Sequence, residues 1–131
     1  METSTIINII INIVLIIAIV WFISIRCAPI KGVRTLSNKA FGQELQNQKN
    51  KMIIDVRDAS EYKTGFIPNA INIPLSQLNH KISDIPKDNN VYLYCRSGMR
   101  SKQAARILSK QGYTKIADLR GGILAWDGQV K

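Results

Sequence analysis

A run near the N-terminus, Ile6 to Ile25, carries no charged side chain and consists almost entirely of large apolar residues. About 20 such residues suffice for a helix to cross the hydrocarbon core of a bilayer. Apart from Ser24 near its end, the polar exceptions are Asn8 and Asn12, which share one helix face. They are either tolerated amides near the outer end of the span or bonding groups for a neighbouring helix. Trp21 and Phe22 lie near the C-terminal end, where aromatic rings favour the membrane interface. We therefore predict a transmembrane helix.

The flanks of this run favour a retained anchor over a cleaved signal peptide. No Lys or Arg precedes the run, and no small-x-small cleavage site follows it. Arg26, Lys31 and Arg34 all lie on its C-terminal side, so the positive-inside bias predicts a single-pass protein of the inner (plasma) membrane with its C-terminal domain in the cytoplasm. Cys27 is predicted to lie beside the membrane, either acylated or as an idle thiol. The predicted organisation is a stub over residues 1–5, the anchor over 6–25, a linker over 26–32 and one domain over 33–131.

Beyond the linker, short apolar segments alternate with helical ones. Such alternation predicts an α/β domain, a doubly wound parallel sheet of about five strands with helices on both faces. The expected strands cover residues 33–36, 51–56, 70–73, 91–94 and 115–119. The expected helices cover residues 38–48, capped by Ser37, 59–64, 77–82, capped by Ser76, and 98–111, followed by a helical turn from Gly121 to Trp126. Trp126 is expected to pack in the core or as a lid.

One of the expected strands leads directly into a cysteine. The segment Cys95-Arg96-Ser97-Gly98-Met99-Arg100-Ser101 follows the apolar strand and precedes a helix. In an open α/β sheet, ligands bind beyond the carboxyl ends of the strands. The amides of such a loop and of the following helix N-terminus favour negative charge at one point. A cysteine at that point is biased toward the thiolate, the nucleophilic form, so the segment is typical of a persulfide-forming loop.

Charge patterning favours an anionic substrate. The chain has 18 Lys and Arg against 9 Asp and Glu, and no acidic residue lies between residues 89 and 117. A cleft with these surroundings would concentrate anions. Lys102, Arg106 and Lys110, four apart, are either part of that field, a solvated helix face, or a contact for anionic lipid head groups. Nucleic acid is not an expected partner, because no aromatic or groove-reading motif accompanies the charge.

The cysteine and histidine content narrows the chemistry. Cys27 and Cys95 are far apart and in different contexts, which predicts neither a disulfide framework nor a metal site, and no cofactor is expected. The single histidine, His80, lies in a polar stretch and is predicted to be solvated on a helix surface. A Cys-His protease pair is therefore not expected.

Three segments resemble motifs of the rhodanese (thiosulfate sulfurtransferase) family, and the plan of the chain is similar to its membrane-anchored, single-domain bacterial members. In this order and spacing they cover essentially all of residues 34–131. One position departs from the family pattern, because Phe66 stands where the Gly-His-Ile-Pro motif has histidine. We expect an altered structural hydrogen bond there and little effect on sulfur chemistry. The segments are residues 54–58 with Glu61-Tyr62 and 65–74; residues 95–101; and residues 119–123 with Ala125-Trp126.

The resemblance implies a double displacement. The Cys95 thiolate takes sulfane sulfur from an anionic donor, thiosulfate or a persulfide, and passes it to a thiol or cyanide. The backbone N–H groups of residues 96–101 can cradle the anionic persulfide, and Gly98 lets the backbone turn. Arg96 and Arg100 are predicted to bind the anionic end of the donor and to favour the thiolate.

Supporting roles are predicted for five further residues. Ser97 and Ser101 add hydroxyl bonds or cap the helix, and Met99 provides apolar packing for the loop. Asp55, at the end of its strand, is predicted to brace the loop by accepting hydrogen bonds. Arg57 is predicted to form a structural ion pair with Asp58 or Glu61.

Other functions stay open at this stage. Four residues separate Cys95 from Arg100, whereas the related phosphatases and arsenate reductases have five, which makes those activities less expected. A persulfide carrier without turnover, or a binding module for a membrane partner, is the main alternative. The intact Cys95 and both loop arginines oppose an inactive binding module. A protein sulfur donor or acceptor is a possible partner, and the sequence names neither it nor the oligomeric state.

Overall fold

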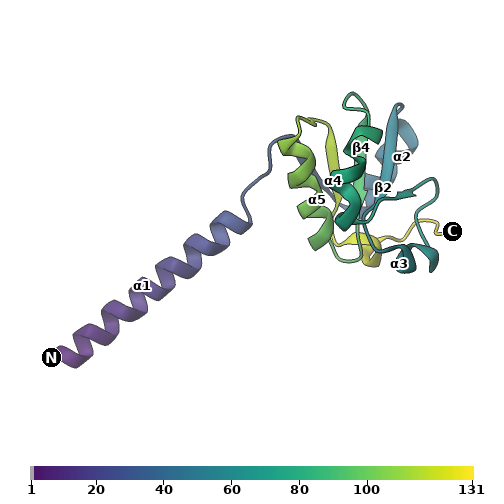
Figure 1. Cartoon of the computed structure of the whole chain (residues 1–131). Coiled ribbons are helices and arrows are strands. Elements are labelled where there is room, and N and C mark those ends of the chain that lie inside the picture. The colour runs from purple at the N-terminus through teal and green to yellow at the C-terminus, as the bar shows by residue number, and fades with distance from the viewer. Residues whose placement is uncertain (1) are drawn as a thin grey trace.

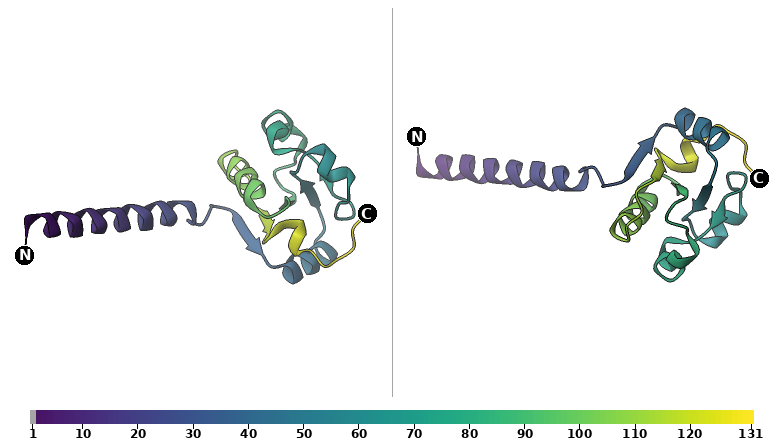
Figure 2. Two further views of the ribbon diagram at one scale, coloured as in Figure 1. Left: turned by 90° about the horizontal axis from the view of Figure 1, so that it is seen from below. Right: turned by 90° about the horizontal axis from the view of Figure 1, so that it is seen from above.

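The computed structural model describes residues 2–131. Helix α1 (Thr3–Arg26) projects away from the rest of the chain, and none of its residues is buried (Figures 1 and 2). Its 24 residues are long and apolar enough to cross a membrane. By length and composition, such a helix near the N-terminus is either a membrane anchor or a signal sequence.

Within the described residues, five strands form one all-parallel sheet in the order β1-β5-β4-β2-β3. β4 therefore lies at the centre, and its Leu93 pairs with Ile54 of β2 and Asp118 of β5. The predicted fold class, an α/β domain with a five-stranded parallel sheet behind an N-terminal apolar helix, is confirmed. The strands are β1 (Val33–Leu36), β2 (Lys51–Asp55), β3 (Ile71–Asn72), β4 (Asn90–Tyr94) and β5 (Ile116–Leu119).

Helices cover both faces of the sheet (Figure 2). α2 (Asn38–Asn47) packs on one face, where Phe41 meets the ring of Tyr92 edge-on at 5.5 Å. α4 (Leu78–Lys81) and α5 (Met99–Lys110) pack on the other face with Val91, Leu93 and Cys95 of the central strand and its end. Successive β4 side chains alternate between the two cores, as the pleat of a strand requires. The remaining helical segments are α3 (Ala59–Lys63), η1 (Leu75–Gln77), η2 (Ile82–Asp84) and η3 (Gly122–Ala125).

Most predicted boundaries agree with the structure to within one or two residues. Ser37 caps α2 as predicted, because its hydroxyl accepts the N–H of Ala40 at 3.3 Å. The prediction that Ser76 caps the next helix is wrong. Ser76 lies inside η1, and α4 begins after Gln77 without a side-chain cap, because Pro74 already starts a tighter turn.

The carboxyl end of the central strand is held against the chain that follows β5. Ile123 donates its N–H to the carbonyl of Cys95 at 2.9 Å, and Leu124 donates to that of Arg96 at 3.2 Å. Gly122 lies so close that a Cβ there would overlap the Arg96 carbonyl. The residues after β4 are therefore pinned by the segment after β5, which closes one side of the loop.

Candidate functional site

Cys95 follows β4 and is 1% exposed. Gly98 donates its N–H to the sulfur at 3.0 Å, and its φ of +106° is one that residues with a Cβ rarely adopt. The positive φ agrees with the turn expected at Gly98, and the Gly98 N–H is one of the donors expected to cradle the sulfur. α5 begins at the next residue, so the positive end of its dipole lies beside the sulfur.

Ser101 lies in the first turn of α5 and is fully buried. The Cys95 thiol donates to its hydroxyl oxygen at 3.5 Å, and the Ser101 hydroxyl donates to the Gly98 carbonyl at 3.3 Å. Ser101 therefore contributes a hydroxyl bond and not the helix cap, since the cap residue is Gly98. The Ser101 hydroxyl is therefore a buried polar group in direct contact with the sulfur.

Arg100 is paired with an acid that lies far away in the sequence. Its guanidinium donates two hydrogen bonds to Glu61 of α3, at 2.6 and 2.9 Å. The Arg100 hydrogen bond is the largest influence on Glu61 and lowers the pKa of that carboxyl to about 2, while Glu61 raises the pKa of Arg100. The expectation of surroundings free of acid is therefore wrong, because α3 brings Glu61 to the loop. Half of the charge predicted for anion binding is neutralised locally.

Arg96 has no ion pair with any residue in the range 2–131 and is exposed. It lines an open hollow of about 510 Å³. The hollow is lined by arginine and glutamate side chains and by two apolar residues of η3. Its lining is Arg57, Ser60, Glu61, Thr64, Arg96, Ile123 and Leu124.

Ser97 and Met99 are both exposed at the surface of the loop. Ser97 is exposed, with no side-chain hydrogen bond to any described residue, and it does not cap α5. Met99 is 73% exposed, so the prediction that it packs the loop is wrong. Its position as the first residue of α5 points it outward, while Ser101 on the other side of the helix turns inward.

Asp55 and Arg57 form an ion pair with each other. The carboxylate accepts from the Arg57 side chain at 2.6 to 3.0 Å, and the pair is buried. The predicted partners of Arg57, Asp58 and Glu61, are wrong, because Asp58 starts α3 with a capping box that uses Glu61. Arg57 also donates to the Gly65 carbonyl at 2.7 Å. The side chain of Asp55 therefore braces the segment before α3 and not the Cys95 loop directly.

Phe66, at the position that departs from the motif, stacks on Tyr62 with ring centroids 4.3 Å apart. Its backbone exchanges two hydrogen bonds with Lys131, at 3.0 and 2.9 Å. The side chain of Phe66 therefore makes an apolar contact, and its backbone holds Lys131 against this turn.

One acidic residue near the loop escaped the motif comparison. Asp118 of β5 is 1% exposed, and both of its carboxylate oxygens lack a hydrogen-bond partner among the described residues. Burial raises the pKa of Asp118 to about 6, opposed by the nearby Ser101 hydroxyl and Lys102. A single acid within the apolar strand Ile116–Leu119 was the signal in the sequence.

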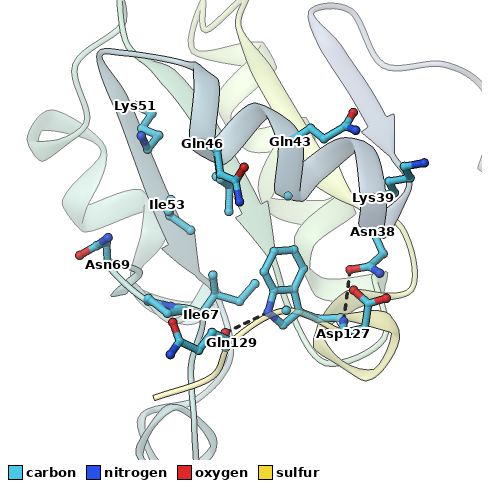
Figure 3. Close-up of a pocket in the computed structure, with 15 residues that line it drawn as sticks. Asn38, Lys39, Gln43, Gln46, Lys51, Ile53, Ile67, Asn69, Asp127 and Gln129 are labelled. Carbon is cyan, nitrogen blue, oxygen red and sulfur yellow. Dashed lines mark hydrogen bonds between the residues drawn. The ribbon is translucent and has the colours of Figure 1, made fainter.

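A second hollow, of about 490 Å³, lies between α2 and the C-terminal segment (Figure 3). Trp126 forms its wall, packing edge-on against Phe41 with centroids 6.0 Å apart and donating its ring N–H to the Gln129 carbonyl at 3.1 Å. The packing role predicted for Trp126 agrees with these contacts. None of the predicted site residues lines this hollow.

The fold and these motifs have relatives of known sequence and structure. Residues 37–129 match the family description "Rhodanese-like domain". A sulfurtransferase of Allochromatium vinosum is 39% identical over 94 residues, covering 72% of this chain and 88% of the relative. The uncharacterized protein YqhL of Bacillus subtilis is 40% identical over 99 residues, covering 76% of each chain. The crystal structure of a rhodanese-related protein from Thermoplasma volcanium matches with a TM-score of 0.68 and 31% identity, over 75% of this chain and 97% of that one. The chain therefore belongs to the rhodanese-like family.

Proposed function

We propose that this protein is a sulfurtransferase that carries sulfane sulfur on Cys95 while anchored to a membrane by residues 6–25. The observation that carries the proposal is the Cys95 sulfur itself, which lies at the start of a helix and accepts the Gly98 N–H at 3.0 Å. A donor N–H and a helix N-terminus favour a negatively charged sulfur. Family membership and the named sulfurtransferase among the relatives support the same reaction.

The reaction is a double displacement at sulfur. The Cys95 thiolate attacks the outer sulfur of thiosulfate, the S–S bond of the donor breaks, and its electron pair leaves with sulfite. Cys95 then holds the transferred sulfur as a persulfide anion. An acceptor thiolate attacks that outer sulfur, and Cys95 departs as the thiolate. Each step conserves charge, so the site needs to hold one negative charge at the sulfur throughout.

The donor is proposed to be a small anion that binds beside Arg96. Two N–H groups of Arg100 are bonded to the carboxylate of Glu61. Arg96 is therefore the exposed cation of the loop that is available to the donor. Ser97 and the outer amides of the loop complete the binding surface, with Arg100 acting to order the loop. Asp55 and Arg57 support the adjoining turn through their buried pair.

The domain boundaries proposed are a linker over residues 26–32 and a rhodanese-like domain over 33–131, held at the cytoplasmic face of the plasma membrane. The apolar helix α1 and the basic residues after it support this placement. The acceptor is then a thiol in the cytoplasm, either a small molecule or a protein at the same membrane.

The test is to treat the reduced full-length protein in detergent with thiosulfate and to measure its intact mass. We expect Cys95 to gain one sulfur atom, and cyanide then to release thiocyanate over many turnovers. The matched variants are Cys95→Ser, which should lose both signals, and Cys27→Ser, which should keep them. Folded, reduced protein that shows neither signal would contradict the proposal.

Two other outcomes would change the assignment. A mass gain without repeated turnover would favour a persulfide carrier, because sulfur would be held but not released to small acceptors. Steady hydrolysis of p-nitrophenyl phosphate, lost in Cys95→Ser, would instead indicate a phosphatase. We expect no such hydrolysis, because only four residues separate Cys95 from Arg100.

A further inference from the structure

Asp118 is a buried acid that the proposed reaction has not used. Side chains of β5 alternate between the two faces of the sheet, with Ala117 and Leu119 in the α2 core and Ile116 in the α5 core. Asp118 is two residues from Ile116 and therefore faces α5. No described side chain supplies a hydrogen bond to either of its oxygens.

Ser101 and Cys95 lie on that same face. The buried residues of α5 are Ser101, Ala104, Ala105 and Leu108, which form one stripe toward the sheet. Asp118 pairs in register with Leu93, and Cys95 follows two residues later on the same side of the strand line. Ser101 therefore lies over the end of the sheet between the acid of β5 and the thiol after β4, and its hydroxyl already contacts the sulfur at 3.5 Å.

The charges around Asp118 come from few elements. Lys102 of α5 and Arg120 after β5 line a hollow of about 300 Å³ together with Asp118, and β1 contributes the uncharged Thr35. The ionisable group on the β4 side is Cys95. Arg100, near the sulfur, is neutralised by Glu61. Burial raises the pKa of Asp118 to about 6, so this carboxyl holds its proton more tightly than an exposed aspartate does.

We propose that Cys95 and Asp118 share one proton through Ser101, so that the thiol becomes a thiolate when the buried carboxylate takes up its proton. Cys95 gives its proton to the Ser101 oxygen, and the Ser101 hydroxyl, turning from the Gly98 carbonyl, gives its own to Asp118. The pair then carries one negative charge, on sulfur. Two negative charges on the same buried face of the sheet would oppose each other.

The proposal rests on the proposed sulfur transfer and extends it. Asp118 stays protonated while Cys95 is a thiolate or a persulfide anion, so neither half-reaction places a second charge beneath the loop. After the acceptor has taken the sulfur and Cys95 is again a free thiolate, the proton can return from Asp118 to the Cys95 sulfur. Asp118 acts through Ser101 and does not touch the donor.

The test measures the reactivity of Cys95 directly and needs no sulfur transfer. In the full-length Cys27→Ser protein in detergent, Cys95 is the only thiol, and its alkylation by neutral iodoacetamide is followed by mass at a series of pH values. Two coupled groups lose their protons in two macroscopic steps. We expect the alkylation rate to rise in two separate steps with pH. Asp118→Asn should leave a single step, and the surface control Asp84→Asn should keep both.

A second measurement does not depend on changing Asp118. Alkylation of Cys95 at pH 7 removes its shared proton partner, so the infrared band of a protonated carboxyl should fall and a carboxylate band should rise. A single step in the Cys27→Ser protein, two steps that persist in Asp118→Asn, or an unchanged carboxyl band would overturn the proposal. Two steps in a protein that takes no sulfur from thiosulfate would contradict the proposed function alone.

Discussion

At the scale of single residues, the site is set by contacts that join distant parts of the chain. Arg100 is two-thirds buried against Glu61, 39 residues away, and Ser101 links the sulfur to the interior. The motif predicted a cationic loop, but the pairing leaves Arg96 as its exposed charge. Arg100 thus holds the loop in place through its ion pair, and Arg96 supplies the charge that attracts anions.

The Glu61→Gln variant tests that division. Gln removes the negative charge that neutralises Arg100, so the field at Cys95 becomes more positive and favours the thiolate. Because the pair is partly exposed, its effect is of the order of a surface ion pair, about 0.2–1 kcal/mol, or roughly a 1.4- to fivefold faster alkylation of Cys95 at pH 7. Asp88→Asn, in an exposed turn, is the matched charge control. Slower alkylation in Glu61→Gln than in wild type would contradict this role.

Asp118 also predicts how stability changes with pH. The pKa of this carboxyl is about 6 in the folded chain and near 3.8 when unfolded, so the folded state binds its proton more tightly. Wild-type protein should therefore lose up to about 3 kcal/mol of stability from this group as pH rises from 4 to above 6. Asp118→Asn should lack that loss. Thermal unfolding in detergent at pH 5 and pH 8, followed by near-ultraviolet circular dichroism, measures the difference. A difference that does not vary with pH would count against it.

At the scale of elements, the active loop depends on how η3 docks against the end of β4. Two N–H groups of η3 hold the carbonyls of Cys95 and Arg96, and Gly122 permits the approach. The same backbone that carries the sulfur is thus fixed by residues that lie 28 positions later in the chain, Ile123 against Cys95 and Leu124 against Arg96. The pair Gly121-Gly122, although distant in sequence, therefore supports the loop that carries Cys95.

Gly122→Ala should break that docking. The added Cβ would overlap the Arg96 carbonyl, and φ at this position is +63°, which disfavours any side chain. We expect a loss of at least about 2 kcal/mol of stability and more than tenfold slower sulfur transfer. Gly42→Ala is the matched control, because its Cβ would meet the Trp126 ring at an ordinary 3.5 Å within helix α2. Unchanged transfer in Gly122→Ala would show that the docking is dispensable.

At the scale of the whole molecule, a rigid domain follows a helix that buries none of its residues in it. The linker between α1 and the domain is short, and two α5 side chains are hydrogen-bonded to its backbone. Arg106 donates to the Arg26 carbonyl at 3.3 Å, and Ser109 donates to the Lys31 carbonyl at 2.6 Å. The basic face of α5 therefore lies beside the end of α1. With the membrane anchor proposed above, we expect this face to attract anionic head groups.

Protease treatment tests the proposed topology. In intact cells the domain after Arg26 should resist added protease, because the positive residues after α1 favour the cytoplasmic side. In inverted membrane vesicles the same domain should be digested while the α1 fragment stays with the membrane. Digestion from outside intact cells would refute the orientation, and full-length protein in the soluble fraction would refute the anchor.

The sequence by itself determined the parallel α/β fold, the strand–loop–helix around Cys95, and the apolar helix, because all three depend on local periodicity, length and turn residues. Only the tertiary structure decided which charges meet. Glu61 pairs with Arg100, Asp55 with Arg57, and Asp118 comes to lie near Ser101. These partners are fixed by strand order and helix packing, which bring together residues far apart along the chain. Local sequence patterns do not show which distant residues come into contact, so the charge pairs of the site are known only from the folded structure.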